Sequence, residues 1–584
     1  MTELHKNILA AGGCTALLGV AAFAGVFTGE PSYYPNMTAY RVGAMLAATG
    51  LGFGLGWLLS PQATWLRTII LATAAAALFL KAAFDNNPVG WWLTYLMAII
   101  GFACGLGYWL RSVARKLGEV PNTFGSAKWA DTRHLWENKV LGRTGFHLGY
   151  FPTDKGLAPL HYEGDRHLLT VSPTRSGKGA TMIIPNLLTY TGSALVIDPK
   201  GENAMVTSEH RAAMGQAIHI VDPWGIAMLP GQRPARFNPL DWLDAGDIDI
   251  TENAMLLADA LAVKEGDNDP FWSEEAKALL QGIILFVATD EDEQGSRHLG
   301  RVRDLLLLDG EDMPALFQRM VQSEHRVVAS CGARCLQKEE KLLANVVASA
   351  QAQTHFLDSP RIRESLSVSD FQFEDLKTLP MTVYLVLPAD RLAAFGRWLR
   401  LLIQQAITVN ARNIERKPER PVLFMLDEMA ALGRLTMVEQ AYGLMAGFGL
   451  QLWGIVQDFS QLEAIYGKGW QTFVSNSGVL QYFGSRDQVT ADYFSALCGV
   501  TTVWNFSTAL ARTFSSGPQS SNSESNTDTT AAAQRKLAYP DELMRIEKSR
   551  QLLLIENLNP IRAKRRRWFE DPKLAALGRN LHAQ

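Results

Sequence analysis

Cysteine is scarce in this chain of 584 residues, and its spacing excludes the common metal-binding and disulfide frameworks. No two cysteines form a CxxC pair. One pair lies four residues apart in a predicted helix, but no histidine accompanies it at metal-ligand spacing. We therefore expect five reduced thiols and no metal centre built from protein ligands alone. The five are Cys14, Cys104, Cys331, Cys335 and Cys498.

Charge is nearly absent from the first 112 residues. The chain has 55 Lys and Arg and 58 Asp and Glu, yet residues 1–112 hold only five of the former and three of the latter. Four apolar runs in this part approach the roughly 20 residues that a helix needs to cross a bilayer, with the third run the weakest. We predict a transmembrane region over residues 1–112 with about four helices, at 8–27, 42–59, 66–84 and 89–110.

The basic residues around these runs predict an orientation. Lys6 precedes the first run, while Arg111, Arg115 and Lys116 follow the last, and four crossings put both ends on one side. The positive-inside tendency makes that side the cytoplasm. We therefore expect a multi-pass protein of a phospholipid membrane with a cytoplasmic soluble part. A cleaved signal peptide over 8–27 is the less favoured alternative, because no clear cleavage site follows.

The soluble part also lacks a basic excess. Residues 113–584 hold 50 basic and 55 acidic residues, so affinity for DNA would have to come from a local patch. The densest basic run spans 562–567 and is followed by Trp568 and Phe569, a mixture that binds phosphates and stacks on bases. A terminal strand with a solvated face is the favoured alternative.

Apolar strand-like runs alternate with helical stretches through most of the soluble part, which predicts a parallel sheet covered by helices. The exception is a long stretch of helical period without a convincing strand. We expect an α/β, RecA-like P-loop fold with an inserted all-α domain. Its predicted parts are 113–237 and 376–584 for the nucleotide-binding domain, 238–375 for the all-α domain, and 515–530 for a flexible Ser/Asn/Thr-rich loop.

A phosphate-binding loop follows the first buried strand of this pattern. In such a loop, backbone N–H groups and a helix N-terminus surround a phosphate, and the lysine reaches the terminal phosphates. Ser172 and Gly179 stand where the usual pattern has Gly and Ser or Thr, so a plain turn before a helix is the alternative. The residues predicted to bind ATP are Ser172, Pro173, Thr174, Arg175, Ser176, Gly177, Lys178, Gly179 and Ala180.

Two apolar strands end in carboxylates that could serve such a site. The first ends at Asp198, and the second runs into Asp427 and Glu428. The second is the better candidate, because Asp427 can orient Mg²⁺ while Glu428 polarises the attacking water. Tandem acids after a strand also serve simply as helix N-caps, which is the alternative for Asp427 and Glu428.

Two further polar residues follow strands. Gln457 is predicted to sense the terminal phosphate, and a strand-end hydrogen bond is its alternative role. Arg486 is predicted to reach a neighbouring subunit's nucleotide as an arginine finger. A surface ion pair with Asp487 is the alternative for Arg486.

Five features together resemble the TraG-type coupling proteins of bacterial type IV secretion and conjugation systems. They are the helical insertion and the segments SPTRSGKG (172–179), IDPKGE (197–202), LDEMAALG (426–433) and IVQD (455–458). The resemblance implies a hexameric ATPase at the bacterial inner membrane that uses ATP and Mg²⁺. It also implies delivery of relaxase–DNA complexes, or of protein effectors, to a type IV secretion channel.

The chain departs from that family in two places. The family commonly has two membrane spans rather than four, and many relatives carry an arginine about where Gln451 stands. Gly179 is common in this branch, but it supplies no hydroxyl for Mg²⁺, so water or Asp427 would fill that position.

Two other readings compete with this one. A septal DNA pump of the FtsK kind would share the anchor and the motor, but it would carry a long linker and a winged-helix tail, which are not apparent in the sequence. A membrane scaffold with a degenerate nucleotide site is suggested by Ser172 and Gly179.

Overall fold

The computed structural model describes residues 50, 52, 123–142, 144–228, 231–262, 270–514 and 522–581. The four predicted membrane spans lie outside these ranges except for residues 50 and 52, so their number stays a prediction. Within the described ranges, no helix is both long and apolar enough to cross a bilayer.

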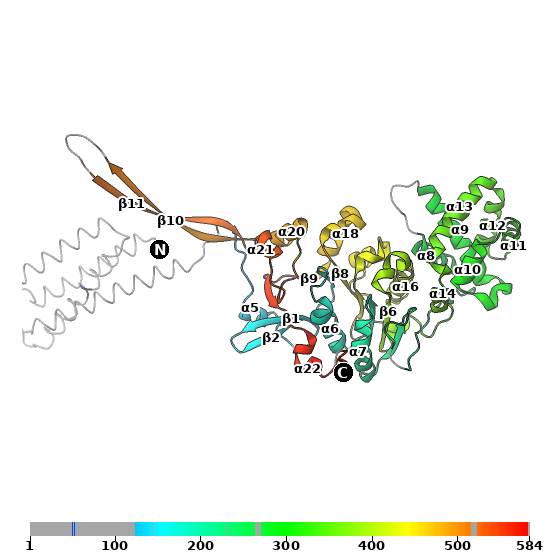
Figure 1. Ribbon diagram of the computed structural model, residues 1–584, viewed down its shortest axis with the longest axis horizontal. Helices are drawn as coiled ribbons and strands as arrows, with labels where there is room; N and C mark the ends of the chain where they lie inside the picture. The colour runs from blue at the N-terminus through cyan, green and yellow to red at the C-terminus, as the bar shows by residue number, and fades with distance from the viewer. Residues whose placement is uncertain are drawn as a thin grey trace, which may run out of the picture. The chain divides into compact units, whose positions relative to one another are not determined.

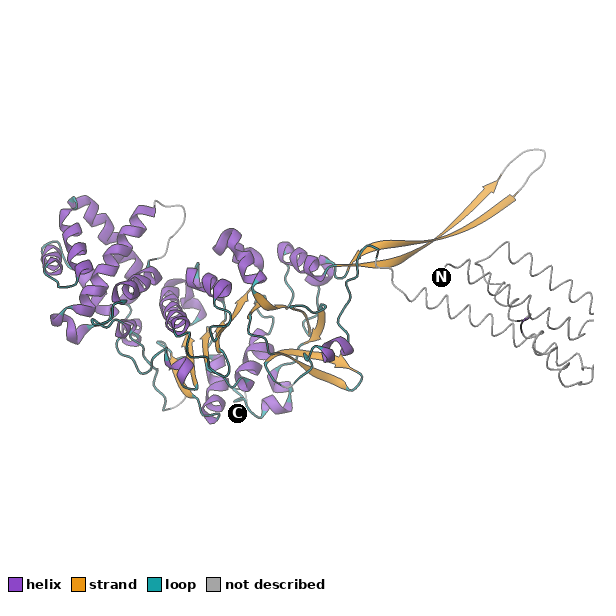
Figure 2. Ribbon diagram, turned by 180° about the vertical axis from the view of Figure 1, so that it is seen from behind, coloured by secondary structure: helices purple, strands orange, loops and turns teal. Residues whose placement is uncertain are grey.

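The largest sheet among the described residues has eleven strands, and seven neighbouring strands in it are parallel (Figures 1 and 2). Six of these strands are fully buried and rich in Val, Ile and Leu, as expected for strands covered on both faces, whereas the edge strand at 217–221 is partly exposed. They lie where the alternating pattern predicts them, which confirms the α/β fold. In spatial order they are β9 (Ser477–Tyr482), β3 (His167–Val171), β8 (Leu450–Val456), β7 (Val422–Leu426), β4 (Ala194–Asp198), β6 (Met381–Val386) and β5 (Ala217–Val221).

The other four strands extend the sheet beyond β9 in antiparallel fashion, a feature that the sequence pattern did not reveal. Two come from near the C-terminus and two from before the phosphate loop, so segments far apart in sequence become neighbours. In spatial order they are β12 (Arg550–Ile555), β13 (Ile561–Lys564), β1 (Phe146–Thr153) and β2 (Gly156–Tyr162).

Helices connect the parallel strands and pack on the sheet (Figure 1). The helix after β3 begins with a π-helical turn, η2 (Gly179–Ile183), and continues as α6 (Ile184–Thr189). The other connecting helices are α7 (Glu202–Ala213), α16 (Leu392–Arg412), α17 (Thr436–Leu444), α18 (Phe459–Tyr466), α19 (Gln471–Ser475) and α20 (Gln488–Cys498).

Between β5 and β6 the described residues form helices and turns but no strand, in keeping with the all-α segment expected there. Buried Leu, Ile and Phe side chains from these helices form their common core. The longer helices are α8 (Ile250–Leu261), α9 (Pro270–Thr289), α10 (Leu299–Leu306), α11 (Asp312–Val321), α12 (Arg326–Gln337) and α13 (Glu340–Thr354), followed by α14 (Pro360–Ser365) and α15 (Asp375–Thr378).

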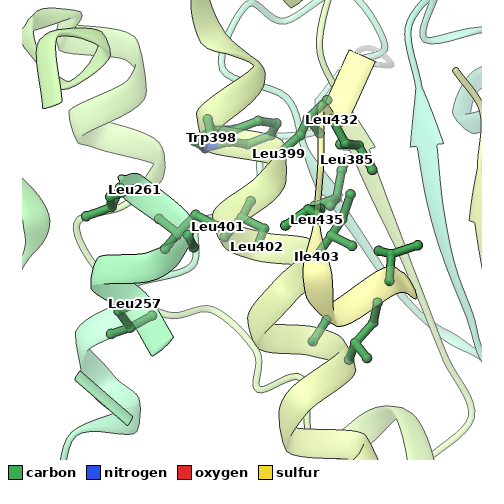
Figure 3. Close-up of a cluster of buried hydrophobic side chains, with 14 of the residues drawn as sticks. Leu257, Leu261, Leu385, Trp398, Leu399, Leu401, Leu402, Ile403, Leu432 and Leu435 are labelled. Carbon is green, nitrogen blue, oxygen red and sulfur yellow. The ribbon is translucent and has the colours of Figure 1, made fainter. Parts of the chain in front are cut away.

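Helix α16 joins this helical segment to the sheet because it is buried on both sides. Leu401 and Leu402 lie toward Leu261 of α8, whereas Leu399 lies toward Leu432, which follows β7 (Figure 3). The Gln404 side-chain amide also donates to the carbonyl of Leu256 at 2.9 Å. A leucine at such a fully buried position contributes about 2–5 kcal/mol relative to alanine. The helical segment and the sheet therefore share one continuous apolar core.

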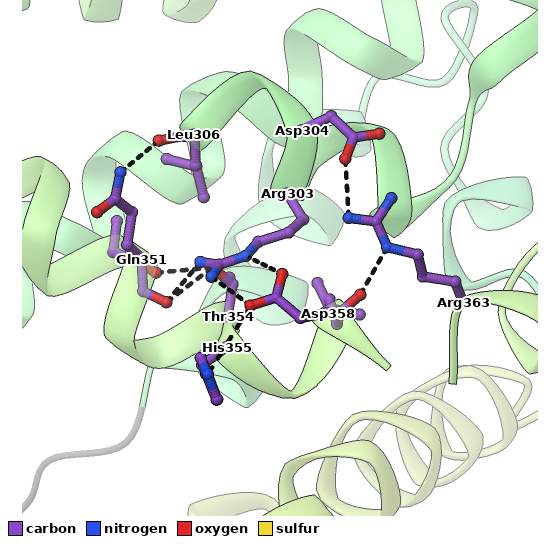
Figure 4. A network of polar contacts seen from close by, with 10 residues as sticks. Arg303, Asp304, Leu306, Gln351, Thr354, His355, Asp358 and Arg363 are labelled. Atoms are coloured by element: carbon purple, nitrogen blue, oxygen red, sulfur yellow. Dashed lines mark hydrogen bonds and ion pairs between the residues drawn. The ribbon is translucent and has the colours of Figure 1, made fainter. Parts of the chain in front are cut away.

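A buried arginine ties the helices of this segment together (Figure 4). Both the Nε and the Nη2 of Arg303 donate to the carboxylate of Asp358, at 2.8 and 2.7 Å. Its Nη1 donates to the carbonyl of Gln351 at 2.7 Å and to the hydroxyl of Thr354 at 3.1 Å. These contacts satisfy a charge that is only 4% exposed.

The flexible loop predicted over 515–530 needs correction. Residues 522–530 belong to β11 (Asn522–Lys536), which pairs with β10 (Val500–Phe514) in a separate two-stranded sheet. Residues 515–521 lie outside the described ranges. The prediction was wrong because it asked only whether this polar tract could bury a core, while two paired strands satisfy each other's backbone groups without one. Residues 502–533 belong to a compact unit distinct from that of 124–501 and 534–584, so the expected segment 376–584 is divided.

Candidate functional site

The predicted site residues follow strands that are neighbours in the sheet. The phosphate loop follows β3, which lies between β9 and β8, while β7 and β4 come next. Because these strands are parallel, the segments that follow them all meet at the carboxyl edge of the sheet, where ligands bind in α/β folds.

Short backbone contacts hold the phosphate loop to the end of β8 and to itself. Ser172 N–H donates to Val456 O at 2.8 Å, and Ser176 N–H donates to Pro173 O at 3.2 Å. The hydroxyls of Ser172 and Ser176 are 2.5 Å apart. Arg175 and Gly177 have positive φ values of 59° and 87°. Such left-handed residues turn successive N–H groups into a concavity that suits an anion.

Lys178 lies at the start of the helix and contacts both predicted acids. Its Nζ lies 2.6 Å from Asp427 Oδ1 and 3.2 Å from Glu428 Oε2. Burial opposes the charge on Lys178, but the two carboxylates outweigh it and raise the pKa of this lysine. Burial also raises the pKa of Asp427, against the influence of Lys178. Two carboxylates thus share one ammonium group.

Glu428 has a left-handed backbone, with φ 63° and ψ 48°. A non-glycine residue in this region costs of order 1–3 kcal/mol, and such strain gathers at functional sites. The conformation brings its carboxylate between two donors. Gln457 Nε2 donates to Glu428 Oε1 at 2.7 Å, and Lys178 donates to Oε2. The structure therefore unites Lys178, Asp427, Glu428 and Gln457 in one cluster, which we call the edge cluster.

The donors at this edge fit a hydrated Mg²⁺ ion beside a phosphate. Carboxylate oxygens are its preferred protein ligands, and Asp427 holds one within ion-pair distance of the phosphate-loop lysine. Gly179 offers no hydroxyl, and the hydroxyl of Thr181 donates to Gly177 O at 2.9 Å within its own helical turn. Asp427, directly or through water, is thus the residue that would hold the ion.

Asp198, the alternative acid, has a different role. It follows β4, is 1% exposed, and accepts N–H groups from Ala204 at 2.9 Å and Lys200 at 3.3 Å. Burial raises its pKa to about 7. The Ala204 bond engages its carboxylate with the first turn of α7, whose N-cap residue is Gly201, so Asp198 holds the start of that helix and is not part of the edge cluster.

Arg486 is not part of the edge cluster. It is exposed in the loop after β9, and among the described residues it makes no ion pair or hydrogen bond. The alternative of a salt bridge with Asp487 is wrong, because the Asp487 carboxylate instead accepts N–H and O–H from Thr490 at the start of α20. Gln451, where many relatives carry arginine, is buried and donates to the carbonyls of Gly164 and Arg166.

One residue beside the phosphate loop was missed as a site residue. Arg565 is 8% exposed, and its Nη1 donates to the carbonyl of Ser176 at 2.9 Å. The signal was present in the basic run, because strand alternation puts Ile561, Ala563 and position 565 on the same, buried face. The high charge of the run suggests an exposed segment, and this hides the burial of Arg565.

A comparison with protein families now identifies the chain. The family described as "Type IV secretory system Conjugative DNA transfer" matches residues 121–583. The chain belongs to this family. Its phosphate loop, its paired acids and its helical segment all lie inside the matched range.

Relatives within curated proteins agree with this membership. The protein is 29% identical to Protein VirD4 of Agrobacterium fabrum (strain C58 / ATCC 33970) over 420 residues, which are 70% of this chain and 60% of VirD4. It is 26% identical to the conjugal transfer protein TraG of Escherichia coli over 503 residues, or 77% of each chain. The chain thus spans about 60% of the length of the VirD4 relative.

Solved structures of coupling proteins share the fold. TrwBdeltaN70 in an unbound monoclinic form matches with a TM-score of 0.55 at 17% identity, covering 76% of this chain and 96% of that one. TrwB in complex with the non-hydrolysable ATP analogue ADPNP matches with a TM-score of 0.56 at 15% identity, covering 75% and 92%. At these identities the likeness concerns the α/β fold alone.

Proposed function

We propose that this protein is an ATP hydrolase that couples substrates to a type IV secretion channel. The observation that carries the proposal is the edge cluster: a phosphate-loop lysine held 2.6 Å and 3.2 Å from two acids that follow β7, a parallel strand separated from β3 by β8. Membership of the family for conjugative DNA transfer supplies the biological context.

The residues of the cluster divide the work of hydrolysis. The loop N–H groups and Lys178 bind the phosphates of ATP. Glu428 accepts a proton from, or orients, the attacking water, and Gln457 holds the Glu428 carboxylate in place. Asp427 would hold Mg²⁺, which neutralises charge on the phosphate oxygens when bound.

Charge balance explains why the cluster suits a ligand. Asp427 and Glu428, when ionised, carry one negative charge more than Lys178 offsets. A bound phosphate draws Lys178 toward itself and would leave the two acids facing an anion, which is unfavourable without a cation. The cluster therefore requires nucleotide and Mg²⁺ together, and we expect ATP to bind poorly when the metal is chelated.

We further propose a homo-hexamer in which Arg486 completes the neighbouring subunit's site. Its support is the exposure of Arg486 in the loop after β9 and its freedom from partners among the described residues. A guanidinium supplied in trans stabilises charge that develops on the phosphate during transfer. Single-particle images that show only monomers with ATP and DNA present would contradict the hexamer.

The membrane anchor, the compartment and the cargo complete the proposal. Residues 1–112 would hold the protein in the bacterial inner membrane with its ATPase part in the cytoplasm, where it would meet relaxase–DNA complexes or protein effectors. A donor strain lacking this chain tests the cargo. Loss of plasmid transfer supports DNA cargo, whereas intact transfer with lost effector delivery supports protein cargo.

ATP turnover by the full-length protein in detergent, with DNA and Mg²⁺, tests the enzymatic proposal. We expect turnover in the unaltered protein and its loss in Lys178→Ala. Lys155→Ala is the matched control, since Lys155 is exposed in the turn between β1 and β2. An inactive unaltered protein, or equal turnover in Lys178→Ala and Lys155→Ala, would contradict ATP hydrolysis at this cluster.

A further inference from the structure

We infer that Arg565, from the C-terminal strand region, is a positioning residue for the phosphate loop and sets its affinity for the phosphates of ATP. The inference rests on the proposed function for its ligand and extends it to a residue more than 380 positions away from the loop. It also gives one member of the basic run at 562–567 a role.

The guanidinium of Arg565 is held in a fixed place. It lies over the ring of Phe483, with Cζ 4.0 Å from the ring centroid. Its Nε donates to Arg550 O at 3.1 Å, its Nη2 donates to Lys548 O, and its Nη1 donates to Ser176 O at 2.9 Å. The three nitrogens thus reach three backbone carbonyls, two near the start of β12 and one in the phosphate loop.

Planarity of the peptide bond converts this contact into an orientation of the loop. In a trans peptide the carbonyl of Ser176 and the N–H of Gly177 point in opposite directions. Holding the Ser176 carbonyl toward Arg565 therefore turns the Gly177 N–H away from it. The next carbonyl, that of Gly177, is fixed in turn by the N–H and the hydroxyl of Thr181, at 3.0 and 2.9 Å. Carbonyls held in this way leave N–H groups to face an anion.

Electrostatics act in the same direction. Arg565 makes no ion pair with an acid among the described residues, so its positive charge is not cancelled locally. Burial lowers its pKa to about 10, which keeps it protonated at neutral pH. A buried cation behind the loop favours an anion in front of it.

The residues that follow Arg565 pack against α6, the helix that continues from the phosphate loop. Trp568 and Leu574 form a small core with Ile184 and Leu188 of α6, and Ala180 packs against it. Arg579 N–H then donates to Val206 O of α7 at 3.0 Å. These contacts explain how a terminal segment keeps a fixed place beside a loop formed much earlier in the chain.

Equilibrium binding of ATP and Mg²⁺ to the full-length protein in detergent tests the inference, with kcat measured separately. We expect Arg565→Ala to weaken ATP binding by about tenfold, the value of one charge-assisted hydrogen bond, and to change kcat by less than about threefold. Methylguanidinium added to this variant should restore part of the affinity. Arg567→Ala is the control, because its side chain is 62% exposed and contacts Glu570 and the ring of Phe569 rather than the phosphate loop.

A second variant guards against a folding defect. Arg565→Lys keeps the charge but not the planar fork, so it should fold like the unaltered protein and still bind ATP more weakly. Unchanged ATP affinity in Arg565→Lys and in any folded Arg565→Ala, or a fall in kcat alone that methylguanidinium does not relieve, would overturn the inference. Binding is read independently of turnover, so a protein that binds ATP without hydrolysing it would count against the proposed function and not against Arg565.

Discussion

Two charged clusters in this molecule differ in how their charges are neutralised. One is the edge cluster, and the other is the Arg303 cluster of the helical segment, formed by Arg303, Asp358, Gln351 and Thr354. Arg303 donates two bonds to one carboxylate, that of Asp358, and its remaining bonds go to a carbonyl and a hydroxyl. In the edge cluster, Lys178 faces two carboxylates, and one of them belongs to Glu428, whose backbone is in the left-handed region.

The two clusters also shift carboxyl pKa values in opposite directions. Hydrogen bonds from Arg303 lower the pKa of Asp358, whereas burial raises that of Asp427 despite Lys178 beside it. A carboxyl group whose pKa falls is stabilised in its charged form by the fold. The comparison therefore separates a balanced cluster that holds helices together from an unbalanced one that gains from a ligand.

The largest expected effect breaks the edge cluster at Glu428, the proposed general base. Glu428→Gln keeps the size of the side chain but removes its charge and its basicity. We expect ATP turnover to fall by about 10²–10⁴-fold while ATP still binds, because a general base contributes about this much. Turnover and ATP affinity measured on the same preparation check this. Turnover close to that of the unaltered protein would remove Glu428 from the chemistry.

The next effect breaks the Arg303 cluster instead. Arg303→Ala leaves a carbonyl, a hydroxyl and a carboxylate without their donor, so we expect the free energy of unfolding to fall by about 2–4 kcal/mol. Turnover per folded molecule should not change. Arg133→Ala is the control, since its pair with Glu137 is exposed and contributes at most about 0.5 kcal/mol. Lost turnover in folded Arg303→Ala would contradict the division between the two clusters.

A smaller effect is expected where Gln457 supports Glu428. Gln457→Ala removes a donor at 2.7 Å from the Glu428 carboxylate, and a hydrogen bond to a charged group is worth about 1.5–3 kcal/mol. We expect kcat to fall by about tenfold with ATP affinity nearly unchanged. Gln488→Ala, at an exposed position of α20, serves as the control. An unaltered kcat would reduce Gln457 to a strand-end hydrogen bond without catalytic consequence.

The smallest expected effect is the pH dependence of the stability that Asp358 contributes, which tests the contrast between the pKa values of Asp358 and Asp427. Asp358 has a lowered pKa in the fold, so its contribution to stability is present above its unfolded pKa of about 3.9 and is lost as pH falls through the lower, folded value. Asp358 is 40% exposed, so we expect Asp358→Asn to cost only about 1 kcal/mol at pH 7. Denaturation of both proteins should show this difference shrinking below about pH 4. A difference in unfolding free energy that grows as the pH falls would contradict a lowered pKa for Asp358 in the folded protein.

The sequence reveals the parallel sheet well because its strands are mostly apolar runs, and β3, β8, β7 and β5 are each followed directly by a polar residue. Lys178, Asp427, Glu428 and Gln457 all follow such runs, and parallel pairing brings them to one edge. The order of the strands does not follow from the chain, since only tertiary pairing puts β8 between β3 and β7.

What the sequence concealed depends on contacts between distant segments. Arg565 lies in a run that charge alone makes resemble a nucleic-acid patch, and only the antiparallel pairing of β12 and β13 brings it to the phosphate loop. The tract from 522 to 530 looked unable to fold because it has no core to bury, yet it pairs with β10. Composition predicts burial, but it does not predict pairing between polar strands.

The most direct test of the central claim is a structure of the full-length protein with Mg²⁺ and a non-hydrolysable ATP analogue. The account predicts that Lys178 Nζ moves from the carboxylates to a phosphate oxygen, while the bonds of Arg303 to Asp358 stay as they are. A nucleotide bound away from residues 172–180, or a Lys178 that keeps both acids as partners with the nucleotide in the loop, would contradict it.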